Sequence, residues 1–147
     1  MEAGDRPRAE DERDVASSRR RAAAWAAGAW LLAIIALSAI ATLRPRLLLQ
    51  VIHYIPGRDK TGHFLLMGGF GGVSVLAFAG RRVGTRRIPV LGVLAVVALF
   101  VVLEEVVQRW LPNRTFSLLD IAASLSGVAC FGALAAAWLA REARSDC

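Results

Sequence analysis

Four apolar stretches within 147 residues limit most strongly what this chain can fold into. Residues 22–43 and 121–140 are uncharged and long enough to cross a bilayer as helices, which takes about 20 residues. Residues 64–80 and 88–103 are shorter and reach that length only if polar residues at one end are included. Because a spanning helix satisfies its own backbone hydrogen bonds, the pattern predicts an all-α, polytopic membrane protein. We expect its membrane domain, residues 22–140, to be a bundle of four transmembrane helices.

Composition supports this fold class and separates two tails from the membrane domain. Hydrophobic residues make up 56% of the chain, and the mean hydropathy is +0.49. A small water-soluble domain could not bury that much apolar surface. Residues 1–21 contain twelve charged residues and few large apolar ones, which predicts a disordered tail. Residues 141–147 form a second, short tail.

The first apolar stretch also has some features of a cleavable signal peptide. Three arginines precede it, and the small residues of Ala39-Ile40-Ala41 fit a cleavage site. Its apolar run is longer than the usual core of a signal peptide, which favours an uncleaved transmembrane helix.

The arginines predict the orientation of the chain in the membrane. The basic residues comprise 17 arginines and one lysine, and they flank the apolar stretches. With the N-terminus inside, nine basic residues next to the spans lie inside and six lie outside, and the loop at residues 81–87 alone holds four arginines. We therefore expect both tails to be cytoplasmic. Because no basic patch with interleaved aromatic residues is present, we expect membrane lipids and no nucleic acid as partners.

Polar residues gather where three of the spans meet one face of the membrane. If the spans alternate in direction, the start of the second, the end of the third and the start of the fourth lie together. These three ends carry Asp59, Lys60, His63, Glu104, Glu105, Gln108, Arg114, Ser117 and Asp120. Ionisable groups at the membrane boundary are costly and therefore indicate function.

From this set we select the candidate site residues. The candidate catalytic residues are His63, Glu105, Arg114 and Asp120. The candidate substrate-binding residues are Asp59, Lys60, Gln108 and Ser117.

Several of these residues also have simpler interpretations. Asp120 or Ser117 could cap the fourth helix, and Arg114 could neutralise Glu105 or Asp120. Of the adjacent pair Glu104 and Glu105, only one can point fully into the bundle. These interpretations do not explain why the polar residues share one face.

Two further features concern packing. Gly68 and Gly72 are one helical turn apart, which allows another helix to approach closely. That helix belongs either to the same bundle or to a second copy in a homodimer. The apolar residues 47–56 are too few to span, and we expect them at the outer interface or as an internal plug.

The polar motifs together resemble the VanZ-like family of small membrane proteins. The resemblance covers residues 59–127, and the motifs that carry it are, in order, Asp59-Lys60-x-x-His63-Phe64, Glu105-x-x-Gln108, Pro112-Asn113-Arg114, Ser117-x-x-Asp120 and Gly127. This sequence departs from the family pattern at three positions. Met67 stands where an aromatic residue is usual, Asn113 replaces a glycine, and Ser124 replaces an asparagine.

The resemblance implies a bacterial membrane protein whose polar motifs lie near the outer surface, in a family named for resistance to the glycopeptide teicoplanin. The first hypothesis is binding or shielding of a lipid-linked cell-wall precursor or a glycopeptide, in which cationic groups hold anions. The alternative is a membrane-embedded hydrolase or transferase with His63 as general base. A proton-coupled transporter is the weaker third, because the inner halves of the spans lack ionisable residues.

The residues leave open whether the protein is an enzyme. No spacing of His, Cys, Asp or Glu predicts a metal site, and no motif predicts a cofactor.

Overall fold

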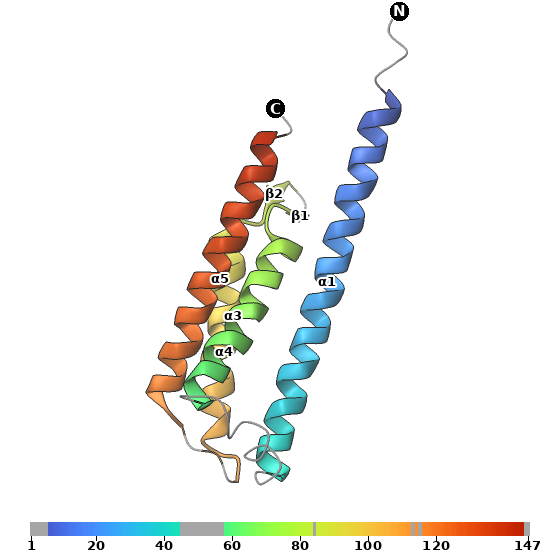
Figure 1. Cartoon of the computed structure of the whole chain (residues 1–147). Helices are drawn as coiled ribbons and strands as arrows, with labels where there is room; N and C mark the ends of the chain where they lie inside the picture. Colours follow the sequence, from blue (N-terminus) through green and yellow to red (C-terminus); the bar gives the residue numbers. More distant parts are fainter. Residues whose placement is uncertain (1–5, 45–57, 84, 113, 115, 146–147) are drawn as a thin grey trace, which may run out of the picture.

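The computed structural model describes residues 6–44, 58–83, 85–112, 114 and 116–145. Its elements are α1 (Arg6–Leu43), α3 (Arg58–Phe78), β1 (Arg82–Val83), β2 (Arg86–Arg87), α4 (Val90–Gln108) and α5 (Leu118–Ser145). The four helices stand side by side (Figure 1), and each is long and apolar enough to cross a membrane. The predicted all-α four-helix membrane bundle is therefore confirmed.

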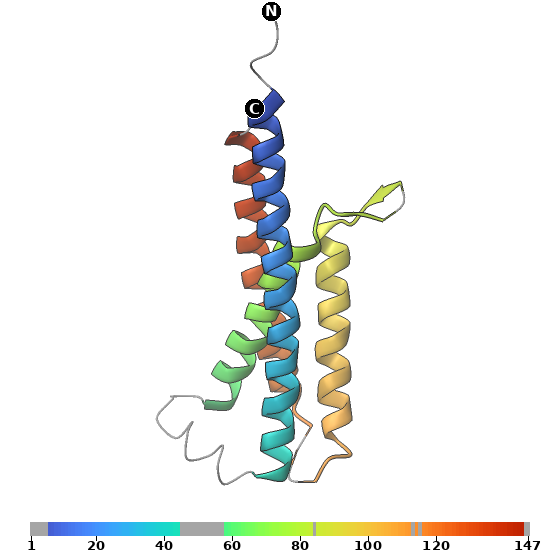
Figure 2. The same cartoon turned by 90° about the vertical axis from the view of Figure 1, so that its right-hand side faces the viewer.

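The two ends of the bundle differ in which chain segments meet there. At one end α1 begins and α5 ends, beside the β1–β2 hairpin (Figures 1 and 2); we call it the terminal end. At the other end α1 and α4 finish while α3 and α5 start; we call it the polar end. It follows that α3 and α5 run parallel to each other, and that both begin at the polar end.

The helix boundaries agree with the prediction for the two short spans and correct it for the N-terminal tail. Helix α3 begins at Arg58 and α4 extends to Gln108, so both include the polar residues next to their apolar stretches. Residues 6–21 are helical and continue α1, so the predicted disorder is wrong there. Six of these 16 residues are arginine, which favours helix, and extending an existing helix is far easier than nucleating one. Residues 1–5 and 47–56 lie outside the described residues.

A short hairpin connects α3 and α4 and contains the arginine-rich loop. Its strands pair antiparallel, with Arg82 opposite Arg87 and Val83 opposite Arg86. The chain leaves α3 through Gly80, whose φ of 74° is in the left-handed region that glycine adopts most readily. The Gly80 amide donates to the Ile88 carbonyl at 2.9 Å, which closes the base of the hairpin.

Helices α3 and α5 touch through glycines on both. A Cβ atom added at Gly68 would lie 2.8 Å from the Phe131 ring and 2.9 Å from the Gly127 backbone, and one added at Gly127 would strike the Phe64 carbonyl oxygen. A Cβ atom at Gly72 would lie 3.3 Å from Phe131. Both Gly68 and Gly72 therefore pack within the bundle. The close contact also sets the α3–α5 register, which places residues near 60–63 beside residues 120–124.

Helix α1 is attached mainly to α3 and is the most exposed of the four. The Trp30 indole Nε1 donates to the Leu66 carbonyl at 2.8 Å, and the ring lies against Gly69, where a side chain would collide with it. Large apolar residues such as Leu32 and Ile35 are exposed on the other side of α1. In a membrane protein such a surface contacts lipid.

Candidate functional site

Buried polar side chains are concentrated at the polar end of the bundle. Within the described residues, Glu105, Gln108, Asp120 and Ser124 are each at most 5% exposed, and Ser74 is the one other buried polar side chain. Burying a carboxylate is costly unless it is hydrogen-bonded or paired. The partners of these groups therefore show how the site is held together.

Glu105 joins the end of α4 to the start of α5. Its Oε1 accepts a 2.8 Å hydrogen bond from the Ser117 amide, and the Ser117 hydroxyl accepts one from the Asp120 amide at 3.3 Å. In a capping box, the acidic residue three positions after the N-cap would bind the N-cap amide. Here Glu105 from another helix does so. Ser117 is therefore the helix cap, and the Asp120 side chain is available for a different contact.

Asp120 joins α5 to α3 through Lys60. The Lys60 Nζ lies 3.4 Å from Asp120 Oδ1, and the Lys60 side chain is 50% exposed while that of Asp120 is 7% exposed. The pair thus has a buried anion and a cation that reaches the surface. The carboxylate also lies in the first turn of α5, where the helix dipole stabilises negative charge.

His63 lies on α3 beside α5, opposite a serine. Its Nδ1 is 3.2 Å from the Ser124 hydroxyl, and His63 and Asp120 both interact electrostatically with Glu105. Ser124 is 1% exposed, so its hydroxyl positions the imidazole and is not accessible to a substrate. Asp59 lies one turn before His63 in α3, and its side chain is outside the described part of the structure.

A second group of hydrogen bonds brings α1 into the site. Glu104 Oε1 accepts from the Ser38 hydroxyl at 2.6 Å and from the Gln108 amide nitrogen at 2.7 Å. The two glutamates differ as expected, since Glu105 is buried and Glu104 is half-buried. The sequence analysis missed Ser38, although it is the only hydroxyl in residues 22–41. That isolation in an apolar span was the available signal.

Arg114 contacts the side-chain amide of Gln108, although a carboxylate was one of the expected partners. Its Nε donates to Gln108 Oε1 at 3.0 Å. Among the described residues it forms no ion pair, because the two salt bridges are Arg19–Glu142 and Lys60–Asp120. The interpretation that Arg114 neutralises Glu105 or Asp120 is therefore wrong. Within the described part of the chain, its half-buried guanidinium has no carboxylate within ion-pair distance.

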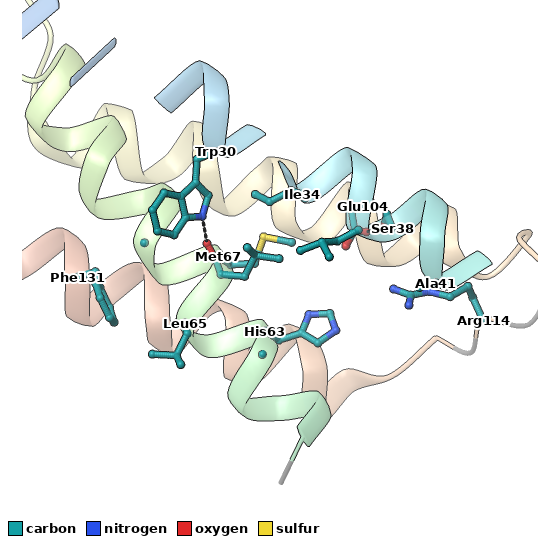
Figure 3. A pocket seen from close by; sticks show the side chains of 14 residues that line it. Trp30, Ile34, Ser38, Ala41, His63, Leu65, Met67, Glu104, Arg114 and Phe131 are labelled. Atoms are coloured by element: carbon teal, nitrogen blue, oxygen red, sulfur yellow. Dashed lines mark hydrogen bonds between the residues drawn. The ribbon is translucent and has the colours of Figure 1, made fainter. Parts of the chain in front are cut away.

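The site opens into a cavity of about 510 Å³ between α1 and α3. Its polar lining consists of Ser38, His63, Glu104 and Arg114, and the rest is apolar or glycine. Figure 3 shows His63 and Arg114 extending into this space, with Ser38 and Glu104 along one wall and the indole of Trp30 at the opposite end. The cavity thus has a polar mouth and an apolar interior.

The chemistry available at this mouth is that of a cation, an imidazole and hydrogen-bonded carboxylates. Across the described residues, no cluster of three or more His, Cys, Asp or Glu is arranged to hold a metal ion. The arrangement can bind an anionic group through Arg114, or accept a proton at His63.

Comparison with known proteins adds no relative. No protein-family model, curated protein or solved structure matches this chain.

Proposed function

We propose that this chain is a VanZ-like integral membrane protein of the bacterial cell envelope, whose polar end faces outward and binds or shields an envelope precursor. The observation that carries the proposal is the concentration of buried polar groups at one end of an otherwise apolar bundle. Charged groups that served only as membrane anchors would be exposed to water at both ends. Burial and linkage across four helices instead favour a binding site.

The proposed orientation places both tails in the cytoplasm. It is supported by the four arginines of residues 81–87 at the terminal end, since cytoplasmic loops are enriched in Arg and Lys. Cys147, outside the described residues, should resist a membrane-impermeant thiol reagent in intact cells and react after lysis. Cys130 is exposed on the surface of α5 within its membrane span and should react poorly in both states. Labelling of Cys147 in intact cells would refute this orientation.

Substitutions at the polar end test the proposed site. His63→Ala, Glu105→Gln, Arg114→Ala and Asp120→Asn should each abolish protection in a teicoplanin-resistance or envelope-stress assay, while the protein remains at normal abundance in the membrane. Because residues that act as a unit are non-additive, a double substitution should add little to a single one. Asp14→Asn and Asp146→Asn, in the tails, are charge controls that should keep full function.

Two outcomes of this series oppose the proposal. If Glu105→Gln and Asp120→Asn both keep full protection at equal abundance, the buried carboxylates have only a structural role. If the tail controls lose protection as well, the assay reports net charge and the site assignment fails.

A membrane-embedded hydrolase or transferase is the second candidate. The observation that favours it is the position of His63, which lines the cavity and is held by Ser124 at Nδ1. An imidazole oriented by one nitrogen can act as a general base with the other. Purified protein that releases inorganic phosphate or a sugar from a lipid-linked substrate, and loses that release in His63→Ala, would favour this candidate over binding alone.

A further inference from the structure

The cavity at the polar end continues along the bundle. A second, almost entirely apolar cavity of about 380 Å³ lies closer to the terminal end, and Trp30, Gly69 and Phe131 line both cavities. The second cavity extends to Trp138 in the last third of α5. We call the two together the α1–α3 groove. It follows the length of the membrane span from a polar mouth to an apolar end.

The groove exists because α1 packs mainly on one neighbour. Its contacts are chiefly with α3, whereas α3 packs extensively on α5. On α1, Trp30, Ile34, Ser38 and Ala41 line the groove at helical spacing, so one face of this helix forms a wall. On the facing helix α3, glycines line the groove, and their lack of side chains leaves space between the two helices. The groove is thus bordered by helices that would stand in lipid.

The charged groups at the mouth of the groove differ in the partners that they have within the protein. Glu104 accepts hydrogen bonds from Ser38 and Gln108, Glu105 accepts one from the Ser117 amide, and Asp120 is paired with Lys60. Each described carboxylate therefore has a partner within the protein. Arg114 lines the groove, and its one described partner is the neutral Gln108 oxygen. A half-buried guanidinium that has no anionic partner among the described residues favours an anionic ligand.

We propose that the α1–α3 groove binds a polyprenyl phosphate, with the hydrocarbon chain along the exposed side chains of Trp30 and Leu37 and the phosphate at Arg114. This inference rests on the proposed function and names the lipid carrier class of the envelope precursor. The two adjoining cavities, which meet at Trp30, supply apolar surface for a long chain. Arg114 supplies the planar, multiply donating group that suits a phosphate.

The position of the polar groups distinguishes this ligand from an ordinary phospholipid. Ser38 and Ile34 are one turn apart on the same face of α1, so the lining changes from polar to apolar within about one helical pitch. A phosphate attached directly to the end of its chain matches that change. A glycerophospholipid would have to place a glycerol and a second chain between the same two regions.

Photocrosslinking of the full-length protein in nanodiscs tests the proposal. A diazirine-bearing long-chain polyprenyl phosphate should label α1 and α3 near Leu37 and Leu65, which line the groove and are exposed. Unlabelled polyprenyl phosphate should compete, whereas polyprenol without phosphate and phosphatidylglycerol should compete at least about tenfold less well, as expected for loss of a charge-assisted interaction.

Two pairs of variants locate the ligand. Leu37→Trp fills the groove and should reduce labelling by about tenfold or more, because the chain loses its contact surface. Leu32→Trp, on the exposed side of α1, should label like wild type. Arg114→Gln should reduce labelling similarly, whereas Arg109→Gln, an exposed arginine at the same end, should not.

The outcomes separate this inference from the proposed function. Labelling that is unaffected by Leu37→Trp and Arg114→Gln, or absent in wild type, overturns the inference, as does equal competition by polyprenol or phosphatidylglycerol. If labelling fails while His63→Ala and Asp120→Asn still abolish protection, the proposed function stands and only the ligand is wrong. If labelling succeeds while those variants keep protection, the lipid site stands and the proposed function fails.

Discussion

The polar and terminal ends of the bundle contain similar residue types but use them differently. At the terminal end, Arg19 and Glu142 form an ion pair at 3.1 Å whose side chains are 71% and 41% exposed. At the polar end, Glu105 is 2% exposed and its carboxylate caps another helix. Exposed ion pairs contribute little to stability, whereas buried carboxylates require partners. The comparison teaches that burial and linkage between helices, rather than charge itself, distinguish a candidate site from a membrane anchor.

The largest expected effect is on the contact that holds the polar end in register. Gly68→Leu should lower the free energy of unfolding by about 3 kcal/mol or more, because the new side chain meets the Gly127 backbone, which cannot rotate away. Gly28→Leu is the matched control, since a Cβ atom there has nothing within 4 Å. Thermal unfolding in detergent measures both. Equal melting temperatures would mean that α3 and α5 do not pack through Gly68.

The next effect compares the two ends directly. Glu105→Ala should destabilise the bundle by about 1–3 kcal/mol, because the Ser117 amide loses its buried acceptor. Glu142→Ala removes an exposed pair and should change stability by less than about 1 kcal/mol. Unfolding in detergent with increasing denaturant gives the two values. Equal losses for the two variants would remove the distinction drawn between the ends.

A smaller effect is expected where α1 joins the polar end. Ser38→Ala removes the hydrogen bond to Glu104 and should cost about 1 kcal/mol. Ser126→Ala is the control, because that exposed hydroxyl bonds only to the carbonyl of its own preceding turn. Hydrogen exchange in α1 gives a local readout that should increase for Ser38→Ala alone. Unchanged exchange of α1 in Ser38→Ala would show that α1 is not anchored by Ser38.

The smallest effect concerns Ser124, the serine beside His63 inside the site. Ser124→Asn should preserve or raise protection, since the amide restores a donor and an acceptor beside His63. Ser126→Asn, two residues further along α5 at an exposed position, should leave protection unchanged. The resistance assay used for the polar-end variants measures both. Loss of protection in Ser124→Asn at normal abundance would show that the hydroxyl itself is required.

The helices and the end of the bundle that carries the polar residues were predictable, because both depend on local features of the sequence. Apolar runs of spanning length predict helices in lipid, and alternating direction brings three particular helix ends together. That reasoning brought His63, Glu105 and Asp120 to one end without any coordinates. The helical state of residues 6–21 was missed, because continuation from the neighbouring span outweighs the high charge of that segment.

The class of protein and the set of polar residues at one end follow from hydropathy and chain direction, which can be read along the chain. The hydrogen-bond partners of those residues depend on the three-dimensional packing. Ser117 is bound by Glu105 from another helix, Arg114 contacts Gln108 in place of a carboxylate, and Ser38 joins the site from α1. Such pairings depend on helix rotation and register, which are set by the close contact at Gly68 and Gly127. That contact arises from packing in three dimensions, which spacing along the chain does not determine.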